Sequence, residues 1–300
     1  MTVTLKSTFF SFCMIIGLMF SATFSRADEQ SKPLSPTLSK ARSLMDRQDY
    51  KSAIKLLTKA RKNGEDTVEI SLLLGEAYGG RIDQVGTLKK MGLAKKLRKN
   101  LEHALDLDPD NLDVLQGLVM FHMQAPSVVG GDREKARELT TKITEKAPLR
   151  GHLLAAQLAS AQKDYKGARA ELAQAKSIAP DKIDVWVGLG LVDMAQKHYD
   201  AAIRNFEHCL KIAPDHIDCH YMIGKAADLG KTASQKGKTA LQKVIELEPK
   251  DKEYLAYAHF RLGNLERAGG DEAAARIHYQ KAIEIANIEP ARKALQNPGK

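Results

Sequence analysis

The sequence predicts an all-α fold of stacked, antiparallel helix pairs. One observation is a set of residue types that recurs about every 34 residues between residues 34 and 287. A second is the spacing of prolines near the ends of apolar helical patterns. These prolines lie 32, 34 and 35 residues apart, at Pro148, Pro180, Pro214 and Pro249. Because one helix pair cannot bury its apolar face alone, such repeats must stack into a solenoid.

The repeat is clearest in residues 183–216. Its marker residues occupy positions 4, 7, 8, 20, 24 and 32, and they are Trp186, Leu189, Gly190, Ala202, Phe206 and Pro214. Gly190 and Ala202 are small, which indicates two helices in close approach, and the large apolar residues fill the volume beside them. Pro214 ends the second helix because proline lacks the backbone donor and clashes with the preceding turn. Asp215 is then the expected cap of the next helix.

The same positions can be followed along the rest of the chain. The residues that fit them are Ala53, Leu57, Ala60, Leu74, Gly75, Tyr78, Ala168, Leu172, Ala175, Ile223, Gly224, Leu262, Gly263, Ala275, Tyr279 and Ala282. The first helix of the last pair is expected to be one turn longer than the others. Two pairs carry extra residues, about ten around 79–86 and five within 125–131, and insertions between the helices of a repeat are expected to form loops.

This pattern resembles that of tetratricopeptide repeat proteins. The segment 126–131 reads Pro-Ser-Val-Val-Gly-Gly, which is similar to the Pro-x-x-x-Gly-Gly interhelical loop of an exported bacterial group of these proteins. The resemblance implies a right-handed α-solenoid of about seven helix pairs over residues 34–289. A capping helix and tail are expected over residues 290–300.

The first 27 residues have the features of a secretory signal peptide. Lys6 gives a positive start, an apolar stretch follows over residues 9–20, and Ser25-Arg26-Ala27 offers small residues for cleavage. An uncleaved anchor helix is the alternative, but the apolar stretch is short for a bilayer. We therefore expect a periplasmic or secreted protein that begins at Asp28, with residues 28–33 disordered.

The chain is basic, with a net charge of +9. Loss of residues 1–27 would leave 44 basic and 37 acidic residues, with a local cluster at Lys89, Lys90, Lys95, Lys96, Arg98 and Lys99. Such a balance could attract nucleic acid or an anionic membrane, but Lys and Arg at helical spacing commonly form a solvated face. Because export disfavours nucleic acid, we expect none as a partner, and membrane contact only through the signal peptide.

Two cysteines remain after residue 27. Cys209 lies at a small, buried position of its repeat, and Cys219 lies in the first turn of the next helix. These positions are neighbours across the interhelical turn, so a disulfide is geometrically reasonable and is favoured by an oxidising compartment. Two buried thiols are the alternative.

No motif of the chain indicates catalysis. His208, Cys209, His216, Cys219 and His220 crowd into one stretch, but their spacing matches no zinc pattern. The turn at residues 130–132 lacks the Gly-Lys-Ser/Thr ending of a nucleotide-binding loop, so Asp132 is interpreted as a helix cap. The sequence therefore predicts no enzyme, no metal site and no cofactor.

The resemblance implies that the first helix of each repeat lines a concave binding face. The positions that it assigns to this face include Met120, Met123, Leu153, Gln157, Val187, Leu191, Met194, Tyr221, Lys225, Tyr257, Phe260 and Arg267. The expected function is a scaffold that binds a peptide or helix of a cell-envelope partner. The alternative is a carrier of a small apolar ligand for an uptake system. These residues could also pack against another copy of the chain, and the oligomeric state is left open.

Overall fold

The computed structural model describes residues 35–296, in which all regular elements are helical. The predicted all-α fold of stacked helix pairs is confirmed for this part of the chain. The chain divides into two compact units, one ending at Ala147 and the other beginning at Pro148. The solenoid predicted over 34–289 spans residues of both units. The expected signal peptide and the expected disordered segment 28–33 lie outside the described residues.

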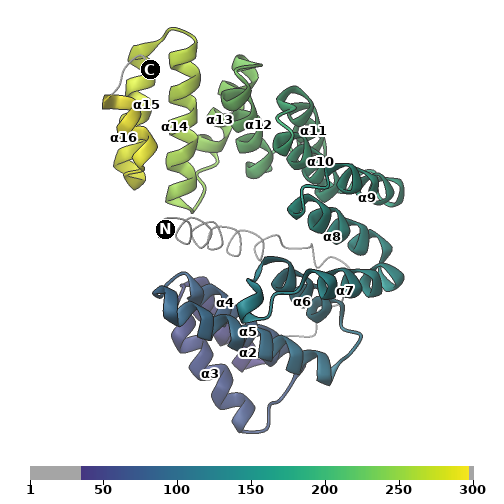
Figure 1. Ribbon diagram of the computed structural model, residues 1–300. Helices are drawn as coiled ribbons and strands as arrows, with labels where there is room; N and C mark the ends of the chain where they lie inside the picture. The colour runs from purple at the N-terminus through teal and green to yellow at the C-terminus, as the bar shows by residue number, and fades with distance from the viewer. Residues whose placement is uncertain (1–34, 297–300) are drawn as a thin grey trace, which may run out of the picture. The chain divides into compact units, whose positions relative to one another are not determined.

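The first unit contains six α-helices and one short 3-10 helix among its described residues (Figure 1). These elements are α2 (Pro36–Asp46), α3 (Tyr50–Lys62), α4 (Val68–Ile82), α5 (Thr87–Leu107), α6 (Leu112–Gln124), η1 (Ser127–Val129) and α7 (Arg133–Lys146). Each α-helix packs against the next one along the chain. Small and large side chains alternate in the core, where Ala53 and Ala77 lie fully buried with Leu57 and Leu74.

The insertion around residues 79–86 lengthens two helices and does not form the predicted loop. α4 continues through both glycines to Ile82, and α5 starts at Thr87 and runs for 21 residues. A Cβ atom on Gly80 would collide with the ring of Tyr50 on α3. The glycines therefore allow a neighbouring helix to approach α4 closely, which a residue count along the sequence does not reveal.

The second insertion forms an ordered turn between α6 and α7. Gly130 adopts a left-handed conformation with φ of 99°, which favours glycine. Asp132 caps α7 as predicted, because its Oδ1 accepts hydrogen bonds from the backbone N–H groups of Glu134 and Lys135. A Cβ atom on Gly130 would collide with the guanidinium of Arg98, so α5 packs directly against this turn.

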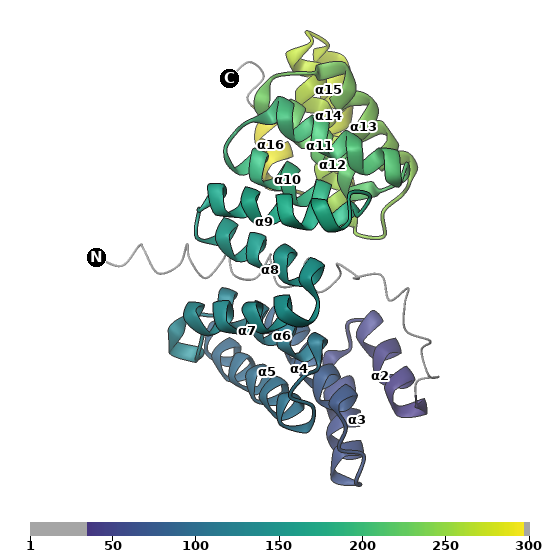
Figure 2. The ribbon, with the colours of Figure 1, turned by 90° about the vertical axis from the view of Figure 1, so that its right-hand side faces the viewer.

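The second unit contains nine α-helices among its described residues (Figures 1 and 2). They are α8 (Pro148–Ala161), α9 (Tyr165–Ile178), α10 (Ile183–Ala195), α11 (Tyr199–Ile212), α12 (Ile217–Gly230), α13 (Ser234–Glu246), α14 (Lys252–Ala268), α15 (Glu272–Ala286) and α16 (Glu289–Gln296). α14 is three residues longer than α12, in line with the expected extra turn. α16 occupies the region of the expected capping helix.

The central pair of this unit shows why its marker residues are needed. Phe206 is fully buried, and a Cβ atom on Gly190 would lie 2.5 Å from its ring. Trp186 packs against this core from a partly exposed position. Its Nε1–H donates a hydrogen bond to the carbonyl oxygen of Pro180 at 2.7 Å. The indole therefore lies at the border of the core, while Phe206 fills its centre.

A buried carboxylate joins three helices of the second unit. Asp193 on α10 is nearly inaccessible, and its oxygens accept hydrogen bonds from Arg169 on α9 and from Asn205 on α11. The distance from Asn205 Nδ2 to Asp193 Oδ2 is 2.7 Å. Because a buried carboxylate is tolerated only when it is paired, this group has a structural role.

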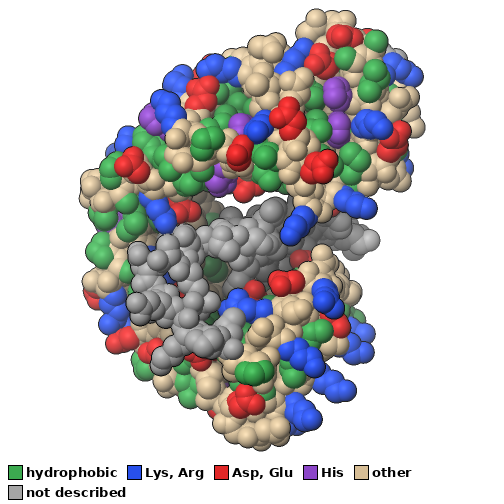
Figure 3. All heavy atoms as spheres, turned by 180° about the vertical axis from the view of Figure 1, so that it is seen from behind, with side chains coloured by type: hydrophobic (Ala, Val, Ile, Leu, Met, Phe, Trp, Pro, Cys, Tyr) green, Lys and Arg blue, Asp and Glu red, His purple; other side chains and the backbone are tan. Residues whose placement is uncertain are grey.

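The outer surface of the described chain carries charges of both signs. Acidic and basic side chains are interspersed over the face seen in Figure 3. Between residues 35 and 296, none of the helices is sufficiently long and apolar to span a bilayer.

Candidate functional site

The candidate binding face lies on the first helices of successive pairs in the second unit. α12 packs against α14, and α10 belongs to the preceding pair (Figure 1). We call the following set the first-helix face: Leu191, Tyr221, Lys225, Asp228, Tyr257, Arg261 and Asn264. Each side chain of the set is at least partly exposed.

Arg261 is the centre of a polar network on this face. Its Nη1 donates a hydrogen bond to Asp228 Oδ2 at 2.8 Å, and its Nε–H donates to the hydroxyl oxygen of Tyr221 at 3.2 Å. Asn264 donates from Nδ2 to the same Asp228 oxygen at 3.1 Å. The hydroxyl of Tyr279 in turn donates to Asn264 Oδ1 at 3.0 Å. The network therefore connects α12, α14 and α15 and holds the Arg261 guanidinium in one orientation.

Burial shifts the pKa values of two ionisable groups at this centre, Asp228 and Lys225. Burial raises the pKa of the Asp228 carboxyl group, while its bonds to Asn264 and Arg261 act in the opposite direction. Burial, and then the nearby positive charge of Arg261, lowers the pKa of the Lys225 ammonium. Among the described residues, no carboxylate pairs with Lys225. The Asp228 carboxylate is thus engaged by Arg261 and Asn264, while Lys225 is left beside the positive charge of Arg261.

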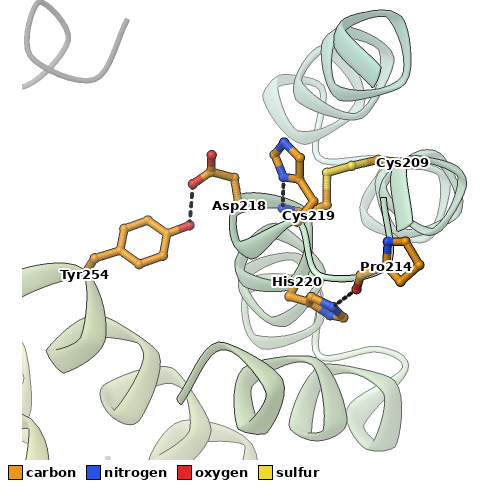
Figure 4. The surroundings of a disulfide bond; sticks show 7 residues. Cys209, Pro214, Asp218, Cys219, His220 and Tyr254 are labelled. Carbon is orange, nitrogen blue, oxygen red and sulfur yellow. Dashed lines mark hydrogen bonds between the residues drawn. A yellow bond between two sulfur atoms is a disulfide. The ribbon is translucent and has the colours of Figure 1, made fainter. Parts of the chain in front are cut away.

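Aromatic rings border the charged centre. The rings of Tyr221 and Tyr254 are tilted against each other with centres 4.4 Å apart. The Tyr254 hydroxyl donates to Asp218 Oδ1 at 2.9 Å (Figure 4). Burial, followed by the Asp218 carboxylate, raises the pKa of Tyr254 still further above neutrality. Tyr257 and Phe260 make an edge-to-face contact at 6.4 Å on α14. The face therefore combines a fixed cationic centre with apolar borders.

Arg267 was predicted to bind a partner, and the structure shows its guanidinium engaged by groups of the same chain. It makes two 2.8 Å hydrogen bonds to the Glu272 carboxylate, and its Nη2 also donates to the carbonyl oxygen of Ala294. Its guanidinium lies 4.7 Å from the ring centre of Tyr279. These contacts come from α15 and α16, and the sequence pattern of α14 alone does not show them.

The structure corrects the predicted position of Leu153. It was predicted to lie on the binding face, but only 4% of its surface is exposed, whereas Gln157 on the same helix is exposed. α8 packs against both α9 and α10 within the second unit. A helix with neighbours on two sides buries a wider arc than a single apolar stripe, which explains the burial of Leu153.

The remaining predicted residues differ in accessibility. Leu191 is 45% exposed, while Val187 and Met194 are partly buried and pack against the core of the second unit. Phe260 is partly buried beside Tyr279. Met120 and Met123 are partly buried on α6 of the first unit, so they are not part of the first-helix face.

Arg261, the residue at the centre of the face, was missed by the sequence prediction. It lies four residues after Tyr257, so the two side chains are neighbours on the surface of α14. The spacing of four residues between Tyr257 and Arg261 was the sequence signal that could have placed Arg261 on this face. Its partner Asp228 comes from another helix, however, and only the packing of α12 on α14 brings the two together.

The structure joins Cys209 on α11 to Cys219 on α12 in a disulfide with Cα atoms 6.5 Å apart (Figure 4). The Nδ1 atom of His216 accepts a hydrogen bond from the backbone N–H of Cys219, so His216 caps α12 in place of the predicted Asp215. A ring nitrogen of His220 donates to the carbonyl oxygen of Pro214 at 2.7 Å. The ligand atoms of Cys209, His216 and Cys219 lie within 4.8 Å of one another, but the sulfur atoms are bonded together and provide no thiolates.

Three stretches of the chain match models of the tetratricopeptide repeat, at residues 38–82, 183–216 and 256–288. A tetratricopeptide repeat protein from Parabacteroides merdae has a similar structure, with 15% identity, a TM-score of 0.55 and coverage of 87% of this chain and 96% of that one. A chain of the APC/C hetero-tetramer Cut9–Hcn1 is similar with 14% identity, a TM-score of 0.59 and coverage of 89% and 49%. Pseudomonas aeruginosa PilF has 16% identity, a TM-score of 0.53 and coverage of 76% and 96%.

No curated protein sequence matches the chain. At these identities the likeness to solved structures concerns the fold alone. The matched stretches and the stacked helix pairs agree with each other, and together they support a tetratricopeptide repeat protein.

Proposed function

We propose that this protein is an exported, non-catalytic scaffold that binds a peptide segment of a cell-envelope protein on its first-helix face. Stacked helical repeats commonly present extended surfaces to protein partners. The face adds a rigid centre, because Arg261 is held by Asp228 and Tyr221 before any partner arrives. A partner would therefore meet a preorganised surface, which lowers the entropy lost on binding.

The observation that carries this proposal is the environment of Lys225. Its ammonium group is partly buried and close to Arg261, and its pKa is lowered by both effects. A desolvated charge without a partner is unfavourable, so a carboxylate that approached Lys225 and Arg261 would be bound strongly. The chemistry of the site thus favours a peptide with an acidic side chain at this position.

The borders of the face add a second requirement. Tyr221 and Tyr257 present partly exposed rings, and Leu191 presents an exposed apolar side chain from the preceding pair. An apolar side chain of the peptide next to its acidic residue could contact these groups and exclude water from the ion pair. Such a combination of apolar anchors and a fixed polar contact gives orientation as well as affinity.

The compartment is also part of the proposal. The apolar stretch at residues 9–20 and the small residues around Ala27 support export. The bond between Cys209 and Cys219 is consistent with an oxidising compartment, where disulfides persist.

Binding can be tested with a panel of fluorescent peptides in which acidic and apolar residues are varied independently. We expect peptides with an acidic residue beside an apolar one to bind, with an affinity that falls as salt is added. Lys225→Met should weaken binding at least about tenfold, because a hydrogen bond to a charged group contributes about 1.5–3 kcal/mol. Lys236→Met is the matched control, since Lys236 is exposed and paired with Glu207 on another surface. Equal binding by both variants would refute the assigned site.

A further inference from the structure

We propose that the first unit also docks on an anionic lipid surface through the N-terminal half of α5. The surface in question, called here the α5 patch, consists of Leu88, Lys89, Lys95, Lys96 and Lys99. All five side chains are exposed, and they lie in the longest helix of the described residues. The first-helix face belongs to the other unit, so this proposal is independent of the proposed function.

The helical period places the patch on one side of α5. Leu93, Leu97 and Leu101 point into the unit and are buried. Lys95 and Lys99 lie one turn apart on the opposite side, and Leu88 lies about two turns before Lys95 on that same side. Gly92 lies between Leu88 and Lys95 along the helix. A Cβ atom added to Gly92 would have no neighbouring heavy atom within 4 Å. The outward side of α5 is therefore open and carries an apolar tip followed by cations.

The cations of the patch have no acidic partners. The sequence contains no Asp or Glu between Gln84 and Leu101. Among the described residues, no carboxylate pairs with Lys89, Lys95, Lys96 or Lys99, and Lys96 instead lies 5.6 Å from the ring centre of Tyr78.

Two acidic groups at the far end of the patch are already paired. Glu102 pairs with Arg98, and Asp66 pairs with His103. Arg61 of α3 donates a hydrogen bond to Asn100 of α5 and so adds a further cation beside this end of the patch. Asp83 lies before the start of α5. The local field is therefore positive, which complements a layer of anionic head groups.

The exposure of Leu88 favours a lipid surface over a nucleic acid as the partner of the α5 patch. Its side chain is 89% exposed, more than that of any other large hydrophobic residue described. A phosphate backbone would gain nothing from an exposed leucine, whereas the boundary between head groups and acyl chains would bury it. Lysines behind an apolar tip are the arrangement of helices that lie in a membrane interface. The sequence led us to expect membrane contact only through the signal peptide, and the exposure of Leu88 is the observation that extends this expectation.

Co-sedimentation with vesicles tests the proposal. The chain from Asp28 onward, which keeps every described residue, is mixed with phosphatidylcholine vesicles that contain either no phosphatidylglycerol or about 30 mol% of it. We expect binding to the anionic vesicles only, and a decrease in binding as salt is added. Lys95→Glu/Lys99→Glu should lower the partition coefficient at least tenfold, and Leu88→Ser should lower it severalfold at constant charge.

The matched control is Lys166→Glu/Lys211→Glu, which changes net charge equally at two exposed lysines of the second unit. This variant should keep most of the binding, and circular dichroism should show that each variant is folded. Equal losses in the control and in the α5 variant would indicate attraction by net charge and overturn the proposal. Binding that tolerates Leu88→Ser, together with tight binding of duplex DNA that needs Lys95 and Lys99, would assign the patch to nucleic acid.

Discussion

The indole ring of Trp186 lies flat against the imidazole of His208, with ring centres 4.0 Å apart and planes 7° apart. The Lys176 ammonium lies 4.3 Å from the centre of the indole. The only tryptophan of the chain is thus held between α9 and α11 at a partly exposed position.

Trp186→Ala should therefore cost less stability than a typical core truncation. We expect a loss of about 2 kcal/mol, since the stacking and cation–π contacts go but no closed cavity forms. Phe206→Ala is the comparison, and its fully buried ring should cost about 3–5 kcal/mol. Urea unfolding followed by circular dichroism measures both, and a larger loss for Trp186→Ala would contradict the packing described.

Two glycines in helices should respond to alanine in opposite directions. At Gly190 a Cβ atom would lie 2.5 Å from the ring of Phe206, so Gly190→Ala should destabilise the chain by about 1–3 kcal/mol. At Gly92 nothing lies within 4 Å, so Gly92→Ala should stabilise it by about 0.5–1 kcal/mol. Thermal melting of the two variants checks both signs, and equal shifts would refute the difference in packing.

Leu191→Asp and Met194→Asp should separate an exposed position from a packed one. Leu191 is largely accessible, so its substitution should change stability by less than about 0.5 kcal/mol. Met194 packs against the core of the second unit, so placing a charge there should cost more than about 1 kcal/mol. Chemical denaturation decides the matter: a stable Met194→Asp with a destabilised Leu191→Asp would reverse the assignment of the two side chains.

Reduction of the disulfide should weaken the second unit without abolishing its fold. The bond closes a short loop, with a sequence separation of 10 residues, so its loss should cost about 2–3 kcal/mol. Urea unfolding with and without a phosphine reductant measures this difference. Alkylation followed by intact-mass analysis provides the control, and two freely reactive thiols in the untreated protein would show that the bond had not formed.

Acid should destabilise the last helix pair through two histidines. The Nδ1 atoms of His259 and His278 lie 3.1 Å apart. Burial, followed by His278 and Lys281, lowers the pKa of His259 to about 4. Burial also lowers the pKa of His278, against the opposing effect of Glu266. Both rings therefore take up protons less readily in the folded chain than in the unfolded one.

A histidine pKa that is lowered in the folded chain makes the free energy of unfolding decrease as pH falls, because the unfolded chain takes up protons first. The contribution of the pair is complete above the ordinary value of 6.5 and is lost as pH falls towards 4. Since both rings are partly exposed, we expect a loss of about 1–2 kcal/mol over this range. Urea unfolding at several pH values should show a shallower decline for His259→Gln/His278→Gln. An unchanged slope would indicate that other groups control the acid response.

The sequence by itself determined the class of fold and most of the local signals. Pairs of helices follow from small and large apolar residues at fixed spacing, as at Gly190 and Phe206. The capping role of Asp132 was also predictable, because a cap depends on atoms only two or three residues away. Such features are local, so a pattern along the chain contains them.

The tertiary structure decided which surfaces remain free. α4 and α5 extend into the segment where a loop was expected, and Gly80 of α4 accommodates the ring of Tyr50 from another helix. Leu153 is buried by helices that are distant in sequence. Arg261 likewise forms its hydrogen bond with Asp228, a residue of another helix. Burial and ion pairing depend on all the elements that surround a side chain. A repeat register therefore places a residue on a helix, but only packing shows whether it meets solvent, core or a partner.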